Sequence, residues 1–340
     1  MDNLKQSVLE SVKLLPEQVQ SSWEYVATMP LPQEFREAKQ IVVSGMGGSA
    51  LGGRVLEHYG KLYLPIPVEV VTHYTLPEYV DEKTLVVISS YSGNTEETIS
   101  AFNDALEKNA MIFVITTGGK LKEIAEEEGV AAYIIEPEYN PSKQPRLATG
   151  YSIGAIFSLL SSLKLLHFDE NQLQSGIKIM RDFVAEYSGE GNKAREITER
   201  LYGKIPILIA SEHLLGAVHI FKNQLNESAK SFSAEFDLPE LNHHLMEGLV
   251  NPEGNKHLIF LMFESRLYHE RVQKRYPITK EVIEKNERDV IAVRLKSETR
   301  FQQVLELLVL GSFIEIYLSE KYDADPIAIP WVDYFKEKLA

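Results

Sequence analysis

Short apolar runs rich in β-branched residues alternate with segments of helical spacing through the first part of the chain. The apolar runs lie at residues 40–44, 68–72, 85–90, 111–116 and 131–135. Helical segments are expected at the N-terminus and at residues 50–59, 96–108 and 120–128. Because the runs are too apolar for half-exposed strands, the alternation predicts a parallel sheet with helices on both faces.

A connector with Pro137, Pro141 and Pro145 interrupts this alternation and is expected to be stiff and non-helical. Beyond it, we expect helices at residues 151–166, 176–186, 213–229 and 300–318, and strands at 204–210, 257–263 and 289–295. The pattern predicts an α/β protein of two doubly wound, flavodoxin-like lobes. The expected domains are residues 1–153 and 154–340, similar in pattern although no sequence repeat links them.

Composition narrows the possible functions. The 340 residues include 44% hydrophobic and 25% charged residues, as in an ordinary soluble globular protein. The absence of cysteine excludes disulfides, thiolate metal sites and a cysteine nucleophile. A net charge of −14 argues against nucleic-acid binding, which needs an extended basic surface. No apolar run reaches the roughly 18 residues of a membrane span, so we expect a cytoplasmic protein without a membrane or nucleic-acid partner.

Two polar turns, each between a strand and a helix, suggest an anion site. Residues 90–98 read SYSGNTEET, and residues 45–53 read GMGGSALGG. Backbone N–H groups at a helix N-terminus attract anions, and serine and threonine hydroxyls add neutral donors. Both turns lie at the carboxyl ends of parallel strands, where ligands of open α/β sheets bind. The sequence therefore predicts one monophosphate site, with helix capping and tight turning at Gly47 and Gly48 as the structural alternative.

The glycine-rich turn is also a weak match to a dinucleotide-binding fingerprint. That interpretation requires an acidic residue at the end of the second strand, but Val71, Thr72 and His73 stand there. The lysine-containing phosphate loop of nucleotide-binding proteins is missing as well. We therefore expect neither a nicotinamide nor a nucleotide cofactor.

Taken together, the motifs resemble those of a known family. The two turns of the first lobe look like a sugar isomerase (SIS) domain. The stretches NQLNESAK (223–230), LPELNHH (238–244) and PWVDYFKEKL (330–339) resemble the bifunctional phosphoglucose/phosphomannose isomerases. The resemblance covers nearly the whole chain. It implies two SIS-type lobes, aldose-ketose isomerisation through a cis-enediol, no metal or other cofactor, and a homodimer.

The resemblance also implies roles for individual residues. It implies phosphate contacts from Gly47, Gly48, Ser49, Ser90, Ser92 and Thr95. Glu227 matches the base that moves a proton between C1 and C2, and Arg146 is expected near the reacting carbons. His243 and Lys336 match residues that open the sugar ring, with His243 reaching the active site of the partner subunit. These residue types suit the reaction, which needs a carboxylate base, a cation beside the enediol and a proton donor near neutral pH.

Each assignment has a structural alternative. Glu227 could be a solvated helix residue, Lys336 a surface cation and Arg146 a partner of surface acids. His243 could be a loop residue or, with His244 and Glu247, part of a metal site that lacks an evident third ligand.

The substrate is open in two respects. The family usually carries threonine before the proline near its terminal lysine, and this chain carries Ile329 there, which predicts weaker activity on mannose 6-phosphate. A sugar-phosphate-binding regulator and an isomerase of another, amino-substituted sugar phosphate are the alternatives. The chain keeps Glu227 and has no basic recognition helix, so the sequence favours an isomerase.

Overall fold

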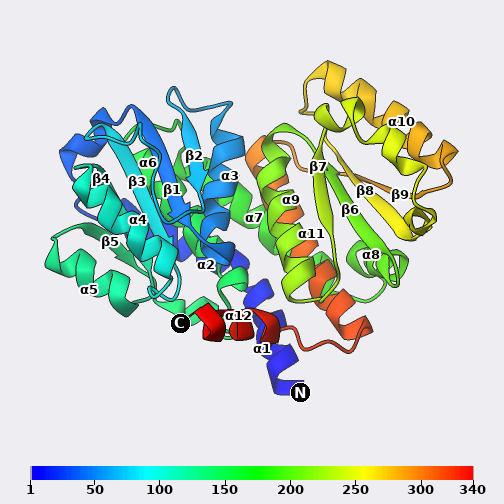
Figure 1. Ribbon diagram of the computed structural model, residues 1–340, viewed down its shortest axis with the longest axis horizontal. Helices are drawn as coiled ribbons and strands as arrows, with labels where there is room; N and C mark the ends of the chain where they lie inside the picture. Colours follow the sequence, from blue (N-terminus) through cyan, green and yellow to red (C-terminus); the bar gives the residue numbers. More distant parts are fainter. Residues whose placement is uncertain (1, 340) are drawn as a thin grey trace.

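The computed structural model describes residues 2–339 and shows two α/β lobes side by side (Figure 1). The first lobe has five parallel strands in the order β2-β1-β3-β4-β5. The strands are β1 (Gln40–Gly45), β2 (Val68–Val71), β3 (Thr84–Ser90), β4 (Met111–Thr116) and β5 (Ala131–Ile134). They agree with the apolar runs to within one residue at each end, because the central strands β1, β3 and β4 are buried on both faces and leave a strong local signal.

Helices cover both faces of this sheet. On one face, Val42 and Val86 pack with Phe102 and Leu121. On the other, the core is continuous with that of the second lobe. The helices of this lobe are α1 (Asp2–Lys13), α2 (Leu15–Ala27), α3 (Leu51–Gly60), α4 (Glu96–Glu107), α5 (Gly119–Glu127) and α6 (Thr149–Ser162).

The second lobe repeats the first topology with one strand fewer. Its parallel order is β7-β6-β8-β9, which corresponds to β2-β1-β3-β4. The strands are β6 (Ile205–Ala210), β7 (Ala234–Asp237), β8 (Leu258–Glu264) and β9 (Asp289–Arg294). The helices are α7 (Glu170–Ser188), α8 (Lys193–Leu201), α9 (Leu215–Glu227), α10 (Glu270–Lys285), α11 (Arg300–Lys321) and α12 (Pro330–Leu339). The expected fold class of two mostly parallel, helix-covered sheets is confirmed.

Three elements of the second lobe are missing from the sequence prediction. β7 is only partly buried at the sheet edge, and α10 is largely polar, so neither has a strong apolar period. α8 is short and polar overall, but it places Ala194, Ile197 and Leu201 at helical spacing on one buried face, a signal that the sequence prediction missed. α10 also contains Pro277, which normally argues against a helix.

The proline-rich connector folds into two short 3₁₀ turns, η3 (Pro137–Tyr139) and η4 (Pro145–Leu147). It leads into α6, which packs on α2 and contains residue 153 in its middle. The division into domains at this position stays a prediction. The other 3₁₀ turns are η1 (Gln33–Glu37), η2 (Gly47–Ala50), η5 (Glu212–Leu214), η6 (Glu240–His243), η7 (Met246–Leu249) and η8 (Glu253–His257).

The two sheets face each other across α3, α9 and α11 (Figure 1). Gly216 at the start of α9 makes this possible, because a Cβ there would lie 2.5 Å from the backbone oxygen of Arg54 in α3. The expectation that no apolar run reaches the length of a membrane span was wrong, because α11 is long and apolar enough to cross a membrane. Its apolar window is wholly buried in the protein, so packing in the core accounts for its composition.

Candidate active site

The glycine-rich turn after β1 is shaped by two glycines. Gly47 adopts φ +50°, a left-handed conformation that favours glycine. A Cβ on Gly48 would lie 2.7 Å from the backbone nitrogen of Arg146, so only glycine lets η2 pass this close to η4. Tight turning is therefore a real requirement at this position. The close packing also places the first candidate phosphate turn directly against the backbone of Arg146.

Side-chain hydroxyls join the two turns. Ser49 Oγ accepts a hydrogen bond from the backbone nitrogen of Tyr91 (2.8 Å), and Ser89 Oγ donates to the Ser49 carbonyl (2.8 Å). These contacts cross from the turn after β1 to the turn after β3, its neighbour in the sheet. The sequence expectation that the two turns converge is met by this geometry.

The second turn keeps several donors free. Ser90 Oγ donates to Thr95 Oγ1 (3.1 Å), and Ser92 Oγ accepts from the Asn94 nitrogen (3.3 Å). Within residues 2–339, no acceptor is found for the hydroxyl protons of Ser49, Ser92 and Thr95, and no side chain caps α4. The N-terminus of α4 and these three hydroxyls can therefore donate to an anion.

Arg146 is almost fully buried, with 2% of its surface exposed, so it does not pair with surface acids. Its guanidinium joins the two lobes. Nε donates to Ser228 Oγ (2.9 Å), and Nη1 lies 3.0 Å from Gln144 Oε1 and 3.5 Å from Glu227 Oε2. Nη2 donates to the carbonyls of Pro326 and Ile327 (3.1 Å for Ile327). All five donors of the guanidinium thus have partners. Arg146 can therefore act on a bound molecule through its positive charge, but none of its N–H groups is free to donate a hydrogen bond.

Glu227 stands at the last residue of α9, at the boundary between the lobes. One carboxylate oxygen faces Arg146, and the side chain is 33% exposed. Its charge is thus compensated on the buried side and accessible on the other. Glu227 and Arg146 are 81 residues apart in sequence, and the fold brings them together.

The segment before α12 is bound next to this pair. Lys230 Nζ donates to the carbonyls of Glu227 and Ala328, the latter at 2.6 Å. Burial and the neighbouring Arg146 lower the pKa of Lys230. Asp325 Oδ1 accepts from the Ile327 nitrogen (2.8 Å), and this hydrogen bond lowers the pKa of Asp325. Ile329 is the residue after Ala328, so its backbone lies close to Glu227 in the fold.

The structure does not connect the other two predicted residues to this pair. His243 is exposed at the end of η6, and Lys336 is exposed on α12, a helix that lies below the two sheets in the view of Figure 1. Neither makes a hydrogen bond or ion pair with the part of the chain that the structure describes. In that part, no three histidine, aspartate or glutamate side chains gather into a group able to hold a metal, and this includes His243, His244 and Glu247.

Glu315 is a residue near the site that sequence reasoning missed. It lies on α11, is fully buried, and is among the groups that interact electrostatically with Arg146 and Glu227. A signal was present in the sequence. Glu315 is an acidic residue inside the apolar run FIEIYL, where a carboxylate would be exposed to solvent only if the helix had a polar face.

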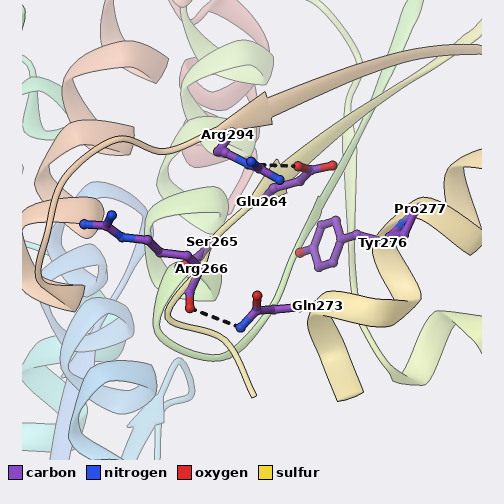
Figure 2. Close-up of a pocket in the computed structure, with 7 residues that line it drawn as sticks. All are labelled: Glu264, Ser265, Arg266, Gln273, Tyr276, Pro277 and Arg294. Atoms are coloured by element: carbon purple, nitrogen blue, oxygen red, sulfur yellow. Dashed lines mark hydrogen bonds and ion pairs between the residues drawn. The ribbon is translucent and has the colours of Figure 1, made fainter. Parts of the chain in front are cut away.

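A separate hollow of about 330 Å³ opens in the second lobe (Figure 2). It lies where β8 and β9 end, against α10. Glu264 and Arg294 line it and pair with each other, with 3.5 Å between Oε2 and Nε, and Gln273 donates to the Arg266 carbonyl. None of the predicted site residues lines this hollow, so it is distinct from the Arg146–Glu227 pair.

Comparison with known protein families matches both lobes. Residues 34–163 match the SIS domain, and residues 190–339 match the bacterial phospho-glucose isomerase C-terminal SIS domain. The chain is 36% identical to the bifunctional phosphoglucose/phosphomannose isomerase of Caldicellulosiruptor bescii, over 98% of this chain and 99% of that one.

A second curated protein and a solved structure also match the chain. The D-glucosamine-6-phosphate 4-epimerase of Sulfolobus acidocaldarius is 35% identical over 65% of this chain and 67% of its own. Among solved structures, a hypothetical protein of Thermus thermophilus superimposes with a TM-score of 0.75 at 18% identity, over 98% of this chain and 91% of that one. The structural match supports the two-lobed fold.

Proposed function

The chain belongs to the family of bifunctional phosphoglucose/phosphomannose isomerases, and we propose that it interconverts glucose 6-phosphate and fructose 6-phosphate. The observation that carries this proposal is the Arg146–Glu227 pair, 3.5 Å between Nη1 and Oε2, held beside the Gly48 turn. It supplies a base and a compensating cation next to a set of anion donors. The enzyme is an aldose-ketose isomerase of the cytoplasm that needs no redox cofactor.

The phosphate binds between the two turns of the first lobe. The free hydroxyls of Ser49, Ser92 and Thr95 and the N-terminus of α4 support this placement. Neither turn contains lysine or arginine, so helix dipoles and hydrogen bonds hold the phosphate. Gly48 fixes the distance from this phosphate to Arg146 and hence to the reacting carbons.

Glu227 is the base of the isomerisation. It takes the proton from C2 of the open aldose while the C1 oxygen gains a proton, which leaves a cis-enediol with a C1–C2 double bond. Return of the proton to C1 and loss of the O2 proton give the ketose. Arg146 places a buried positive charge beside Glu227, which orients the carboxylate and stabilises negative charge on the enediol oxygens.

His243 and Lys336 open the sugar ring, and His243 does so in the active site of the second subunit. Two observations support a homodimer. His243 is exposed and lacks a polar partner in the described chain, and α12 exposes Trp331, Tyr334 and Phe335 to solvent at 82%, 55% and 62%. Exposed aromatic residues of this kind are typical of protein interfaces.

Mixed dimers test this arrangement. His243→Ala and Glu227→Gln are each expected to be inactive as homodimers. A heterodimer of the two variants has one active site with both residues intact, so subunit exchange should restore about a quarter to a half of the wild-type activity per dimer. A verified heterodimer without activity would place His243 in its own subunit or outside the mechanism.

Mannose 6-phosphate is a second, weaker aldose substrate. The enediol is planar at C2 and loses the configuration that distinguishes the two aldoses, so the site has only to accept two orientations of the sugar. Ile329 follows the segment that Arg146 and Lys230 bind, and its bulk narrows this tolerance. Equal kcat/KM for the two aldoses would show that Ile329 does not discriminate between them.

Replacement of Glu227 tests the mechanism. Glu227→Gln keeps the shape but cannot accept the C2 proton, so kcat should fall by roughly 10²–10⁴-fold with little change in ligand affinity. Glu264→Gln is the matched control, because Glu264 also lies 3.5 Å from an arginine and belongs to the same lobe. Its kcat should stay within about twofold of wild type.

Deuterium exchange gives the sharper measurement. In heavy water, the wild type should incorporate deuterium at C2 of the aldose or C1 of the ketose, and Glu227→Gln should not. Wild-type exchange in the variant would show that the base lies elsewhere. Binding of glucose 6-phosphate without turnover by the wild type would instead favour a sugar-phosphate-binding regulator.

An amino sugar phosphate is the second candidate substrate, and the 35% identity to a D-glucosamine-6-phosphate 4-epimerase is the observation that favours it. A coupled assay with glucose, mannose and glucosamine 6-phosphates separates the possibilities. Fructose 6-phosphate should form from the first two sugars. Conversion of glucosamine 6-phosphate at a higher kcat/KM than either would make it the main substrate.

A further inference from the structure

Glu315 is a buried carboxyl group whose nearest polar contact, the Ser228 hydroxyl, is a weak one. Its side chain is fully enclosed by protein, and neither oxygen makes a hydrogen bond of normal geometry with the described residues. Burial of an ionised, unpaired carboxylate is strongly unfavourable. Glu306, the other buried glutamate of α11, accepts hydrogen bonds from the backbone nitrogens of Lys296 and Ser297 at 3.0 and 2.9 Å. Packing in the helix therefore does not explain Glu315.

The register of α9 against α11 places Glu315 beneath the Arg146–Glu227 pair. Gln224 Nε2 of α9 donates to Ser312 Oγ of α11 at 2.9 Å. One helical turn further along both helices, Ser228 meets Glu315, and the Ser228 hydroxyl lowers the pKa of Glu315. Ser228 Oγ also accepts the hydrogen bond from Arg146 Nε at 2.9 Å. A continuous polar path thus runs from Glu315 through Ser228 and Arg146 to Glu227.

One guanidinium serves two carboxyl groups in this cluster. Arg146 has a single positive charge. It lies 3.5 Å from Glu227, and it also lowers the pKa of Glu315. If both glutamates were ionised, the buried cluster would carry a net negative charge. Burial raises the pKa of Glu315 to about 8, against the opposing effects of Ser228 and Arg146. Near pH 7, Glu315 is therefore a neutral carboxylic acid, and the charge of Arg146 is left to Glu227.

We propose that Glu315 is a positioning residue for the isomerisation, which acts through Ser228 and Arg146 on the geometry and charge of Glu227. The inference rests on the assignment of Glu227 as the base. When Glu315 loses its proton at alkaline pH, a second carboxylate competes for Arg146. The guanidinium then stabilises the enediol less well, and the rate falls.

Other charged groups face the same region. Lys230, just beyond α9, lowers the pKa of Glu315 less than Arg146 does and has Asp325 as its own acidic neighbour. On α8, the guanidinium of Arg195 lies over the Tyr317 ring. Arg195 contacts another part of α11 and is not among the groups that shift the pKa of Glu315. The test must therefore change Glu315 alone.

Glu315→Gln mimics the neutral acid and cannot ionise, so it separates the two forms. We expect kcat for glucose 6-phosphate at pH 7 to stay within about threefold of wild type, with KM unchanged. Wild-type kcat should decline above pH 8, and Glu315→Gln should lack this decline. At pH 9 the variant should exceed the wild type by roughly tenfold, the ratio expected one unit above a pKa of 8. Glu306→Gln, on the same helix, is the control and should keep the wild-type profile.

A second measurement does not depend on activity. The infrared band of a protonated carboxylic acid should be present in the wild type at pH 7, disappear on titration through pH 8, and be absent from Glu315→Gln. An unchanged alkaline decline in Glu315→Gln, or a spectrum without this band in the wild type, would overturn the proposal. Failure of the Glu227 assignment is recognised separately, by normal deuterium exchange in Glu227→Gln.

Discussion

The two lobes share the backbone of their functional turns and differ in the side chains that occupy them. After β1, η2 begins at Gly47 with φ +50°, and after β6, η5 begins at Glu212 with φ +47°. After β3 and β8, the helix caps Thr95 and His269 each stand five residues beyond the strand end. The loops of the two lobes therefore have the same geometry, although the side chains at these positions differ.

In the second lobe, the anion position is filled by the protein itself. Glu212 Oε1 accepts a hydrogen bond from the His269 nitrogen at 2.7 Å, at the N-terminus of α10. In the first lobe, Gly47 has no side chain at this place, and the Thr95 nitrogen has no partner among residues 2–339. One lobe can therefore accept an external phosphate while the other already holds a carboxylate. A shared fold does not imply a shared site.

Among the variants that test this comparison, Gly47→Glu should have the largest effect, because it moves the carboxylate of the second lobe into the first. The backbone has the φ that Glu212 adopts, and a Cβ at Gly47 meets no atom within 4 Å. The new carboxylate should bind the Thr95 nitrogen and repel the phosphate. We expect kcat/KM to fall by about 10³-fold, since like charges in contact cost several kcal/mol.

Two variants control for this change. Gly47→Ala carries the strain of a positive φ, about 1 kcal/mol, without the charge, so its loss should stay within about tenfold. Glu212→Gly opens the second-lobe position and should leave kcat/KM within about twofold. If Gly47→Glu kept more than a tenth of the wild-type kcat/KM, the phosphate would have to bind elsewhere.

Loss of a hydroxyl should have different consequences in the two lobes. Thr95→Val keeps the shape and removes one donor to the phosphate, so KM should rise about tenfold, since a hydrogen bond to a charged group contributes about 1.5–3 kcal/mol. In the second lobe, Ser265 Oγ donates to Gln303 Oε1 (2.6 Å) and accepts from the Leu267 nitrogen (2.9 Å). Ser265→Ala should lower the free energy of unfolding by about 1–3 kcal/mol and leave KM unchanged. Steady-state kinetics and urea denaturation distinguish these outcomes, and an unchanged KM in Thr95→Val would contradict the comparison.

The last contrast between the lobes concerns the pH dependence of stability. Where the first lobe has Gly48, the second has the buried His213, whose pKa burial lowers to about 4. The unfolded chain gains a proton near pH 6.5 and the folded protein only near pH 4. Stability from this residue is therefore complete above about pH 6.5 and declines as the pH falls toward 4, by about 1.4 kcal/mol per unit. Urea denaturation at pH 7, 6 and 5 should show a smaller acid loss in His213→Gln than in wild type. Equal slopes would exclude this contribution.

Sequence patterns predicted the fully buried strands well and the polar elements poorly. β4 matches its predicted range, because its residues are apolar on both faces. β7, with the sequence AEFD, and α10, with its internal proline, give no clear local period. Their positions are decided by pairing with β6 and by packing on β8 and β9.

The candidate site also has features that the sequence predicted and features that it did not. The sequence indicated both candidate phosphate turns and, through a family resemblance, Arg146 and Glu227. It could not predict that every donor of Arg146 is bound within the protein, because four of its partners, Glu227, Ser228, Pro326 and Ile327, are more than 80 residues away. The roles of all the candidate site residues, the homodimer and the domain boundary stay predictions.

The sequence by itself determined the alternation of strands and helices, the tight turn at Gly47 and Gly48 and the hydroxyl-rich caps, since each depends on neighbouring residues. Tertiary structure decided which charges meet. Arg146 reaches Glu227 because Gly48 lets the connector pack closely and Gly216 lets α9 pack closely on α3. Glu315 lies next to this pair because α11 packs in register with α9. Such contacts depend on packing between distant segments, and the energy of a buried charge depends on all its neighbours at once. No local pattern carries that information.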